Sequence, residues 1–250
     1  MCRGEYVAFC DTDDLVSPQL IAALTKAAEV FGSPDMMIYS LFRGMPKSGW
    51  PVYDVEAMSE ADGELFNAEE VMMKIFTDNM TEGYSWNKAV KKEFAQSVKY
   101  DESLVMHEDE YYFVSMLLKN GQMRACHLNY CLYCYFPSSS SEAAGKILRN
   151  RNPEGYPRNI EVSEKILSLP NLPPKVAEQI EARNYYFAVK CIFSNRTPIT
   201  PAAYARLREH LRKSAWKYYF KRKGRKITTK LTIFIVHILI LLHIRMPRRK

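Results

Sequence analysis

The stretch Glu5-Tyr6-Val7-Ala8-Phe9-Cys10-Asp11-Thr12-Asp13-Asp14 decides the fold class. Residues 6–9 are apolar or favour β structure and contain no turn signal, so residues 5–10 predict a buried strand that runs directly into three acidic residues. A helix is predicted over 19–31, where Gly32-Ser33-Pro34 ends it, and a second apolar strand follows over 35–42. Strand, helix and strand in this order predict an α/β fold with a mostly parallel sheet flanked by helices.

The composition and the rest of the pattern predict three parts. With 250 residues and 47% hydrophobic residues, the chain has a globular composition, which excludes a wholly disordered chain, a collagen and a coiled coil. We expect a partial α/β domain over 1–141, with a short helix or loop at 86–94, a helix at 108–119 and a strand at 123–136. A proline-interrupted helical region over 142–220 and a basic, apolar tail over 221–250 follow. Because two or three strands make too small a sheet, we expect the intact domain to contain further strands before residue 5.

Charge is divided unevenly along the chain. Residues 205–250 contain 15 Lys and Arg and one acidic residue, whereas the preceding residues contain 20 basic and 27 acidic ones. The apolar stretch 227–244 is interrupted by polar residues and is shorter than the roughly 20 residues that a spanning helix needs.

The tail therefore predicts peripheral attachment to an anionic membrane surface, at the inner, cytoplasmic face. A short tilted spanning helix and a helix packed on the protein itself remain alternatives. Nucleic acid is not a predicted partner, because no recognisable binding module accompanies the basic charge.

The acidic turn 11–14 lies just after a predicted strand, where open α/β sheets place ligands. Asp11, Asp13 and Asp14 repel one another unless a cation neutralises them, and Mg²⁺ or Mn²⁺ prefers such oxygen ligands. Two alternatives remain open. The acids could decorate a helix N-terminus, which the helix dipole favours. The strand followed by Asp-x-Asp also resembles the haloacid-dehalogenase-type phosphatases, in which Asp11 would be the nucleophile and Asp13 the general acid.

A second group of motifs follows in a specific order. Trp86-Asn87-Lys88 is followed by Tyr100-Asp101-Glu102 and then by Glu108-Asp109 at the start of a predicted helix, where carboxylates are stabilised. Taken with residues 4–14, this order resembles that of family 2 glycosyltransferases of the GT-A fold, over roughly residues 3–136. The family's first βαβ units, which hold the nucleoside, have no counterpart here, so the resemblance implies a truncated GT-A domain.

The resemblance also implies roles for individual residues. Asp11 and Asp13 match the Asp-x-Asp motif that meets the sugar nucleotide and its metal, with Asp13 as the direct ligand and Asp14 beside them. Asp109 matches the carboxylate that serves inverting members as general base, and Glu108 is its usual neighbour. The segment of Trp86, Asn87 and Lys88 matches one that borders the acceptor side of the cleft, where an aromatic ring suits an apolar sugar face.

The sequence thus predicts a metal-assisted glycosyltransferase fragment. The complete enzyme would move a sugar from a nucleotide-diphospho-sugar donor to a hydroxyl of a glycan or glycolipid acceptor, in cell-surface polysaccharide or glycolipid synthesis. A different class remains open, a non-catalytic fragment that binds a membrane or a partner through its tail. The spacing of Cys126, Cys131 and Cys134 is found in some iron–sulfur proteins, but we expect buried or half-buried free thiols.

Overall fold

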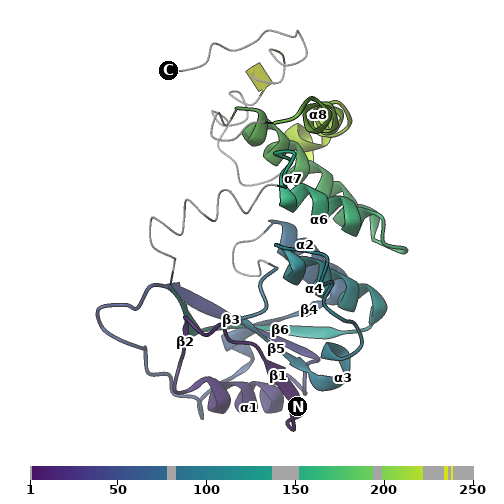
Figure 1. The fold of residues 1–250 in the computed structure, drawn as a ribbon. Coiled ribbons are helices and arrows are strands. Elements are labelled where there is room, and N and C mark those ends of the chain that lie inside the picture. Colours follow the sequence, from purple (N-terminus) through teal and green to yellow (C-terminus); the bar gives the residue numbers. More distant parts are fainter. Residues whose placement is uncertain are drawn as a thin grey trace. The chain divides into compact units, whose positions relative to one another are not determined.

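The computed structural model describes residues 2–77, 83–136, 152–193 and 199–221, together with Phe234, Ile235 and Ile238. The chain divides into two compact units, Met1–Ser140 and Ser141–Lys250. The first unit contains the sheet and the second is helical (Figure 1).

Six strands form one mixed sheet in the first unit. They are β1 (Tyr6–Ala8), β2 (Leu15–Val16), β3 (Met36–Arg43), β4 (Gly63–Asn67), β5 (Lys88–Lys91) and β6 (Arg124–Tyr135), with the order β1-β5-β3-β6-β2. The long strand β6 pairs with β3 along one edge, while its other edge pairs first with β4 and then with β2. The acidic turn therefore connects β1, at one edge of the sheet, to β2, at the other.

The prediction of a mostly parallel sheet is wrong. Only β3 and β6 pair in parallel, and the other four pairings are antiparallel. β1 and β3 do run in the same direction, as the strand-helix-strand pattern predicts, but β5 lies between them and is antiparallel to both. The expected helix or loop at 86–94 is correct for its last residues, which begin the short α3 (Lys92–Ala95), but it also contains the strand β5, whose four residues are too few to show an alternating pattern. The coarser class, α/β, is confirmed.

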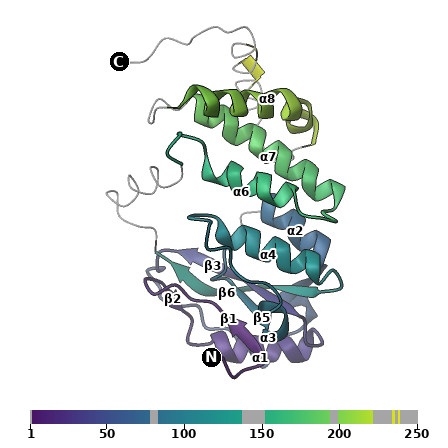
Figure 2. The ribbon, with the colours of Figure 1, turned by 45° about the vertical axis from the view of Figure 1, so that its right-hand side comes forward.

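Helices cover both faces of this sheet. Figures 1 and 2 show α1 (Leu20–Val30) on one face, and α2 (Ala68–Thr77) and α4 (Glu108–Lys119) on the other. The short α3 (Lys92–Ala95) and the 3₁₀ turn η1 (Glu60–Asp62) complete the unit. Because both faces are covered, successive residues 36–39 of β3 are all buried, which explains the unbroken apolar run in the sequence. The predicted helix at 108–119 is confirmed, and β6 matches the predicted strand at 123–136 within one residue at each end.

The described part of the second unit contains α6 (Arg158–Leu167), α7 (Pro174–Phe193) and α8 (Pro201–Lys221). A polar cluster ties α8 to α6: Glu164 accepts hydrogen bonds from Tyr156 at 2.9 Å and from Arg206 at 2.7 Å, and His210 lies 2.9 Å from it. Burial alone would raise the pKa of Glu164, but the hydrogen bonds from His210 and Tyr156 and the charge of Arg206 outweigh it and lower that pKa.

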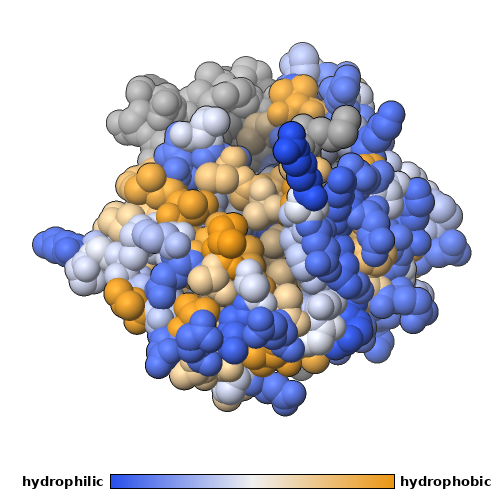
Figure 3. Space-filling view, turned by 90° about the horizontal axis from the view of Figure 1, so that it is seen from below, coloured by the Kyte–Doolittle hydropathy of each residue, from blue (hydrophilic) through white to orange (hydrophobic). Residues whose placement is uncertain are grey.

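Most of the tail 221–250 lies outside the described residues. Within the described part of the chain, no helix is both long and apolar enough to cross a membrane. Exposed large apolar side chains of the first unit include those of Ile21 on α1, Leu15 and Val16 on the edge strand β2, and Val52 in the loop after β3. Seen from the side that carries α1, apolar residues gather over one part of the surface, and hydrophilic residues cover much of the remainder (Figure 3).

Candidate functional site

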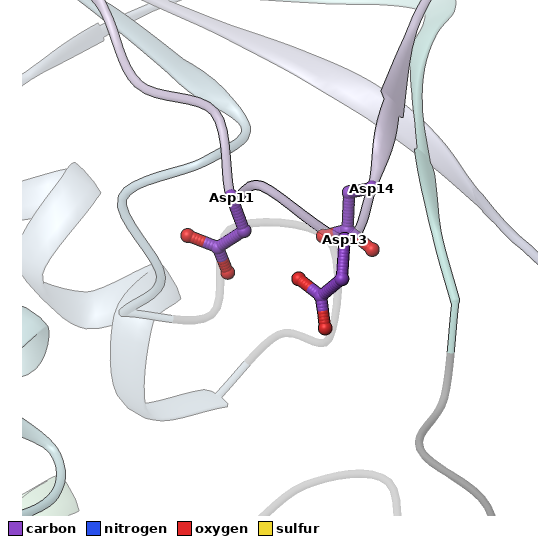
Figure 4. A group of neighbouring side chains, drawn as sticks. All are labelled: Asp11, Asp13 and Asp14. Atoms are coloured by element: carbon purple, nitrogen blue, oxygen red, sulfur yellow. The ribbon is translucent and has the colours of Figure 1, made fainter.

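Three carboxylates converge in the turn between β1 and β2. One ligand oxygen from each of Asp11, Asp13 and Asp14 lies within 4.8 Å of the others, and this is the only such group of acidic, histidine or cysteine side chains within the described residues. Figure 4 shows the carboxylates of Asp11 and Asp13, both exposed, turned to the same side of the turn. Oxygen-only donors suit Mg²⁺ or Mn²⁺.

The helix-terminus explanation of these acids is wrong. The strand β2 intervenes between the turn and α1, so α1 begins only at Leu20 and has no acidic residue in its first turn. The dipole of α1 therefore does not account for three acids at this place.

Asp14 anchors the turn to the sheet. It is buried, its Oδ2 accepts a hydrogen bond of 2.7 Å from the Tyr133 hydroxyl, and its Oδ1 accepts one of 2.8 Å from the backbone N–H of Phe136. The N–H of Asp11 donates to the same Tyr133 hydroxyl at 3.1 Å. Tyr133 thus joins both ends of the turn, and Asp14 holds the turn while Asp11 and Asp13 face outward.

The carboxylate of Asp11 is affected by negative charges from the turn itself and from α4. Burial raises the pKa of Asp11, and the charges of Asp14, Asp109 and Asp13 raise it further. Asp109 therefore lies within Coulombic reach of the turn, although it is 98 positions further along the chain. A cation at the turn would relieve this repulsion.

Aromatic packing explains how α4 reaches the turn. Phe9, two residues before Asp11, makes edge contacts with Tyr112 and Phe113 at ring-centroid distances of 6.5 and 6.3 Å. Phe113 lies one helical turn after Asp109 in α4, so this contact holds the start of α4 beside the end of β1.

Asp109 is a half-buried carboxylate with defined donors. Its Oδ2 accepts hydrogen bonds from the backbone N–H and the hydroxyl of Ser85, both at 3.2 Å. Burial raises its pKa; the backbone bond from Ser85 opposes this, the charge of Glu108 raises it further, and a hydrogen bond from Tyr100 lowers it. A carboxylate with a raised pKa is a better proton acceptor when ionised.

Gly83 packs closely against the first turn of α4. A Cβ atom on Gly83 would lie 2.3 Å from Cγ of Glu110, so only glycine allows this approach. The helix begins after His107, which adopts a left-handed conformation with φ of 64°. Close packing and this bend together place Asp109 against Ser85.

The predicted acceptor segment is mostly buried. Trp86 stacks on Tyr84 and Tyr133, each 4.8 Å away between ring centroids, and it is buried, so its indole is not available for a sugar. Asn87 and Lys88 are also buried, with 1% and 0% of their surface exposed. In this structure these three side chains therefore belong to the interior of the first unit. Tyr84, 39% exposed at the end of the stack, presents an aromatic ring beside Ser85 and hence near Asp109.

Sequence reasoning missed four residues that build the site: Tyr84, Ser85, Tyr100 and Tyr133. Ser85 and Tyr84 stand next to the recognised motif, and Tyr100 opens another one, so their positions carried a signal. Tyr133 carried none, because it occupies an ordinary interior position of β6 that is 119 residues from Asp14.

An open depression of about 380 Å³, lined by Gly4, Glu5, Lys91, Lys92, Glu93 and Gln96, contains none of the candidate residues.

Comparison with protein-family models and with curated proteins found no match for this chain.

Proposed function

We propose that this chain carries the metal- and acceptor-side half of a glycosyltransferase site, which uses a nucleotide-diphospho-sugar donor, Mg²⁺ or Mn²⁺ and a carboxylate base. The observation that supports this most is that Phe9, two residues before the acidic turn, packs against Tyr112 and Phe113 of α4, the helix that carries Asp109. Such a transfer needs one group of carboxylates that holds a cation and one carboxylate that accepts a proton. Asp11 and Asp13 are exposed and suit the first task, and Asp109, held by defined donors, suits the second.

Each group has a distinct task in this proposal. Asp11 and Asp13 would hold the cation, which when bound stabilises negative charge on a diphosphate leaving group. Asp109 would take the proton from the incoming hydroxyl of the acceptor, with Ser85 and Tyr100 orienting its oxygens. Tyr84 offers an aromatic face where a sugar ring of the acceptor could stack.

Cation binding is the first test. Titration calorimetry with Mn²⁺ on the full chain should detect one site, and Asp13→Asn should weaken it by about tenfold or more. Glu60→Gln, which removes the same charge from an exposed position in η1, is the matched control and should leave affinity unchanged. Equal affinity in all three proteins would contradict the assignment.

Turnover is the second test. Donor hydrolysis and transfer with UDP-, dTDP- and GDP-sugars should require Mn²⁺ and should be lost in Asp13→Ala and Asp109→Asn. If these variants keep full turnover, the assigned roles are wrong. Phosphate release from phosphomonoesters that depends on Asp11 would instead favour the phosphatase alternative.

We further propose that the tail attaches the protein peripherally to the inner, cytoplasmic face of an anionic membrane. The support is the basic cluster at 221–226 beside the apolar stretch 227–244. The full chain should sediment with vesicles that contain phosphatidylglycerol and not with vesicles of phosphatidylcholine alone. Glutamine at the five basic positions of 221–226 should abolish the difference, and sedimentation that is unaffected by these changes would contradict electrostatic attachment.

A further inference from the structure

Lys88 is a fully buried lysine beneath the site. It opens β5, none of its surface is exposed, and its ammonium lies 5.0 Å from the ring centre of Phe113 in α4. Lysine is rarely buried to this extent unless its charge is compensated, because desolvating an ammonium group is costly. A specific set of oxygens must therefore hold the ammonium in place.

The ammonium binds the segment that precedes β5. Nζ donates to the backbone carbonyl oxygen of Tyr84 and, at 2.6 Å, to Oδ1 of Asn87. The backbone N–H of Lys88 donates to the carbonyl of Ser85 at 3.1 Å. One residue thus binds two successive carbonyl groups of the turn that begins beside α4.

The first of these carbonyls belongs to the same peptide unit that binds Asp109. The carbonyl of Tyr84 and the N–H of Ser85 lie at opposite sides of one planar peptide bond, so a group that fixes the oxygen also fixes the direction of the N–H. That N–H donates to Asp109 Oδ2 at 3.2 Å. A cation at the oxygen also polarises the peptide and strengthens its N–H as a donor.

Two later carbonyl groups of the turn are held by β3. Tyr39, in the central strand β3, donates its hydroxyl to the carbonyl of Trp86 at 3.1 Å, and its backbone N–H to the carbonyl of Asn87 at 3.1 Å. The Tyr84–Ser85 peptide takes part in neither of these two bonds, and its carbonyl oxygen is bound by the ammonium of Lys88.

We propose that Lys88 is a positioning residue, whose buried ammonium holds the Tyr84–Ser85 peptide so that its N–H is directed at Asp109. The ammonium of Lys88 and the carboxylate of Asp109 are thereby coupled through the dipole of one peptide group. This coupling does not require the two side chains to touch. Lys88 then has no contact with a substrate, unlike the donor- or acceptor-binding role that the sequence predicts for it. The claim that this positioning matters for a reaction rests on the proposed function. The coupling between Lys88 and Asp109 does not depend on that function.

Nuclear magnetic resonance of the full chain tests the coupling without any substrate. Lys88→Met keeps the length of the side chain and removes its charge, and Lys92→Met on α3 is the control. We expect the Ser85 amide to exchange with solvent at least about tenfold faster in Lys88→Met, and at the wild-type rate in Lys92→Met. The amide of Met116, in the middle of α4, should keep its protection in both and so report that the fold is intact.

A double-mutant cycle separates positioning from general loosening. If Lys88 acts through the peptide, Asp109→Asn should also accelerate exchange at Ser85, and the double variant should exchange no faster than the faster single variant. Additive acceleration, or a Ser85 amide unaffected by Lys88→Met, would overturn the proposal.

A second measurement covers the case in which Lys88→Met does not fold. In the otherwise unchanged chain the buried ammonium should give a slowly exchanging ¹⁵Nζ signal, and Asp109→Asn should shift it while Glu60→Gln does not. An unshifted signal would overturn the coupling. If Asp109→Asn loses turnover but Lys88 and Asp109 show no coupling, only the positioning role is refuted. If the two residues are coupled but Asp109→Asn keeps full turnover, only the proposed function is refuted.

Discussion

Replacing Tyr133 by phenylalanine removes one oxygen atom from the centre of the candidate site. The ring keeps its stack on Trp86, but Asp14 loses the 2.7 Å hydrogen bond to its Oδ2 and retains only the bond from the N–H of Phe136. Burial raises the pKa of Tyr133, as does its bond to Asp14, so the hydroxyl is protonated and donates to the carboxylate.

A hydrogen bond to a charged group contributes about 1.5–3 kcal/mol, and a buried carboxylate oxygen left without a donor is at the upper end of that range. The N–H of Asp11 also loses its acceptor, but it lies near the surface, where water can replace the hydroxyl. We therefore expect Tyr133→Phe to lower the free energy of unfolding of the first unit by about 2–3 kcal/mol. It should also weaken Mn²⁺ binding, because the turn that presents Asp11 and Asp13 is no longer held.

Urea unfolding followed by the fluorescence of Trp86 measures this change, in a background where Trp50 and Trp216 are phenylalanine. Tyr130→Phe is the matched control: Tyr130 is also buried in β6, its ring stacks on Tyr53 at 4.2 Å, and no hydrogen bond of its hydroxyl occurs among the described residues. A loss in Tyr133→Phe no larger than that in Tyr130→Phe would refute the argument that Tyr133 anchors the acidic turn.

Two further predictions concern packing and charge. Gly83→Ala should destabilise the first unit by about 1–3 kcal/mol, because the added methyl group collides with Glu110, whereas Gly121→Ala, which meets nothing within 4 Å, should be close to neutral in the same urea assay. Since the folded state lowers the pKa of Glu164, its contribution to stability should be complete above the unfolded value of about 4.3 and should disappear as pH falls through the folded pKa. Thermal unfolding between pH 7 and pH 3 should therefore depend less on pH in Glu164→Gln than in the control Glu154→Gln, and equal slopes would contradict this sign.

The sequence predicts the long elements well because their burial is periodic or continuous. The helix at 108–119 has its buried residues on one side, and residues 36–40 of β3 are buried on both faces of the sheet, so both leave a clear pattern. β2 and β5 have two and four residues, which is too short for any periodicity. β5 lies between β1 and β3 and is antiparallel to both, so these two strands do not pair with each other as expected. Strand direction is a property of the whole sheet, and a local pattern does not contain it.

The candidate site shows the same limit in its chemistry. Acidic residues and motif order are visible in the sequence, and they correctly mark Asp11, Asp13 and Asp14 as a group that shares one place in the structure. The exposure of a side chain is not visible in the sequence. The motif therefore predicts that Trp86 and Lys88 contact a ligand, whereas neighbouring side chains enclose both in the structure.

The two carboxylate groups are linked by neutral aromatic side chains, and this explains how they coexist. Tyr133 binds Asp14 and stacks on Trp86, which stacks on Tyr84, and the N–H of the next residue, Ser85, holds Asp109. Hydroxyl and N–H donors hold Asp14 and Asp109 in place without adding a positive charge at their oxygens. Among the described residues no basic side chain forms an ion pair with Asp11 or Asp13, so the repulsion between these carboxylates favours the binding of a divalent ion.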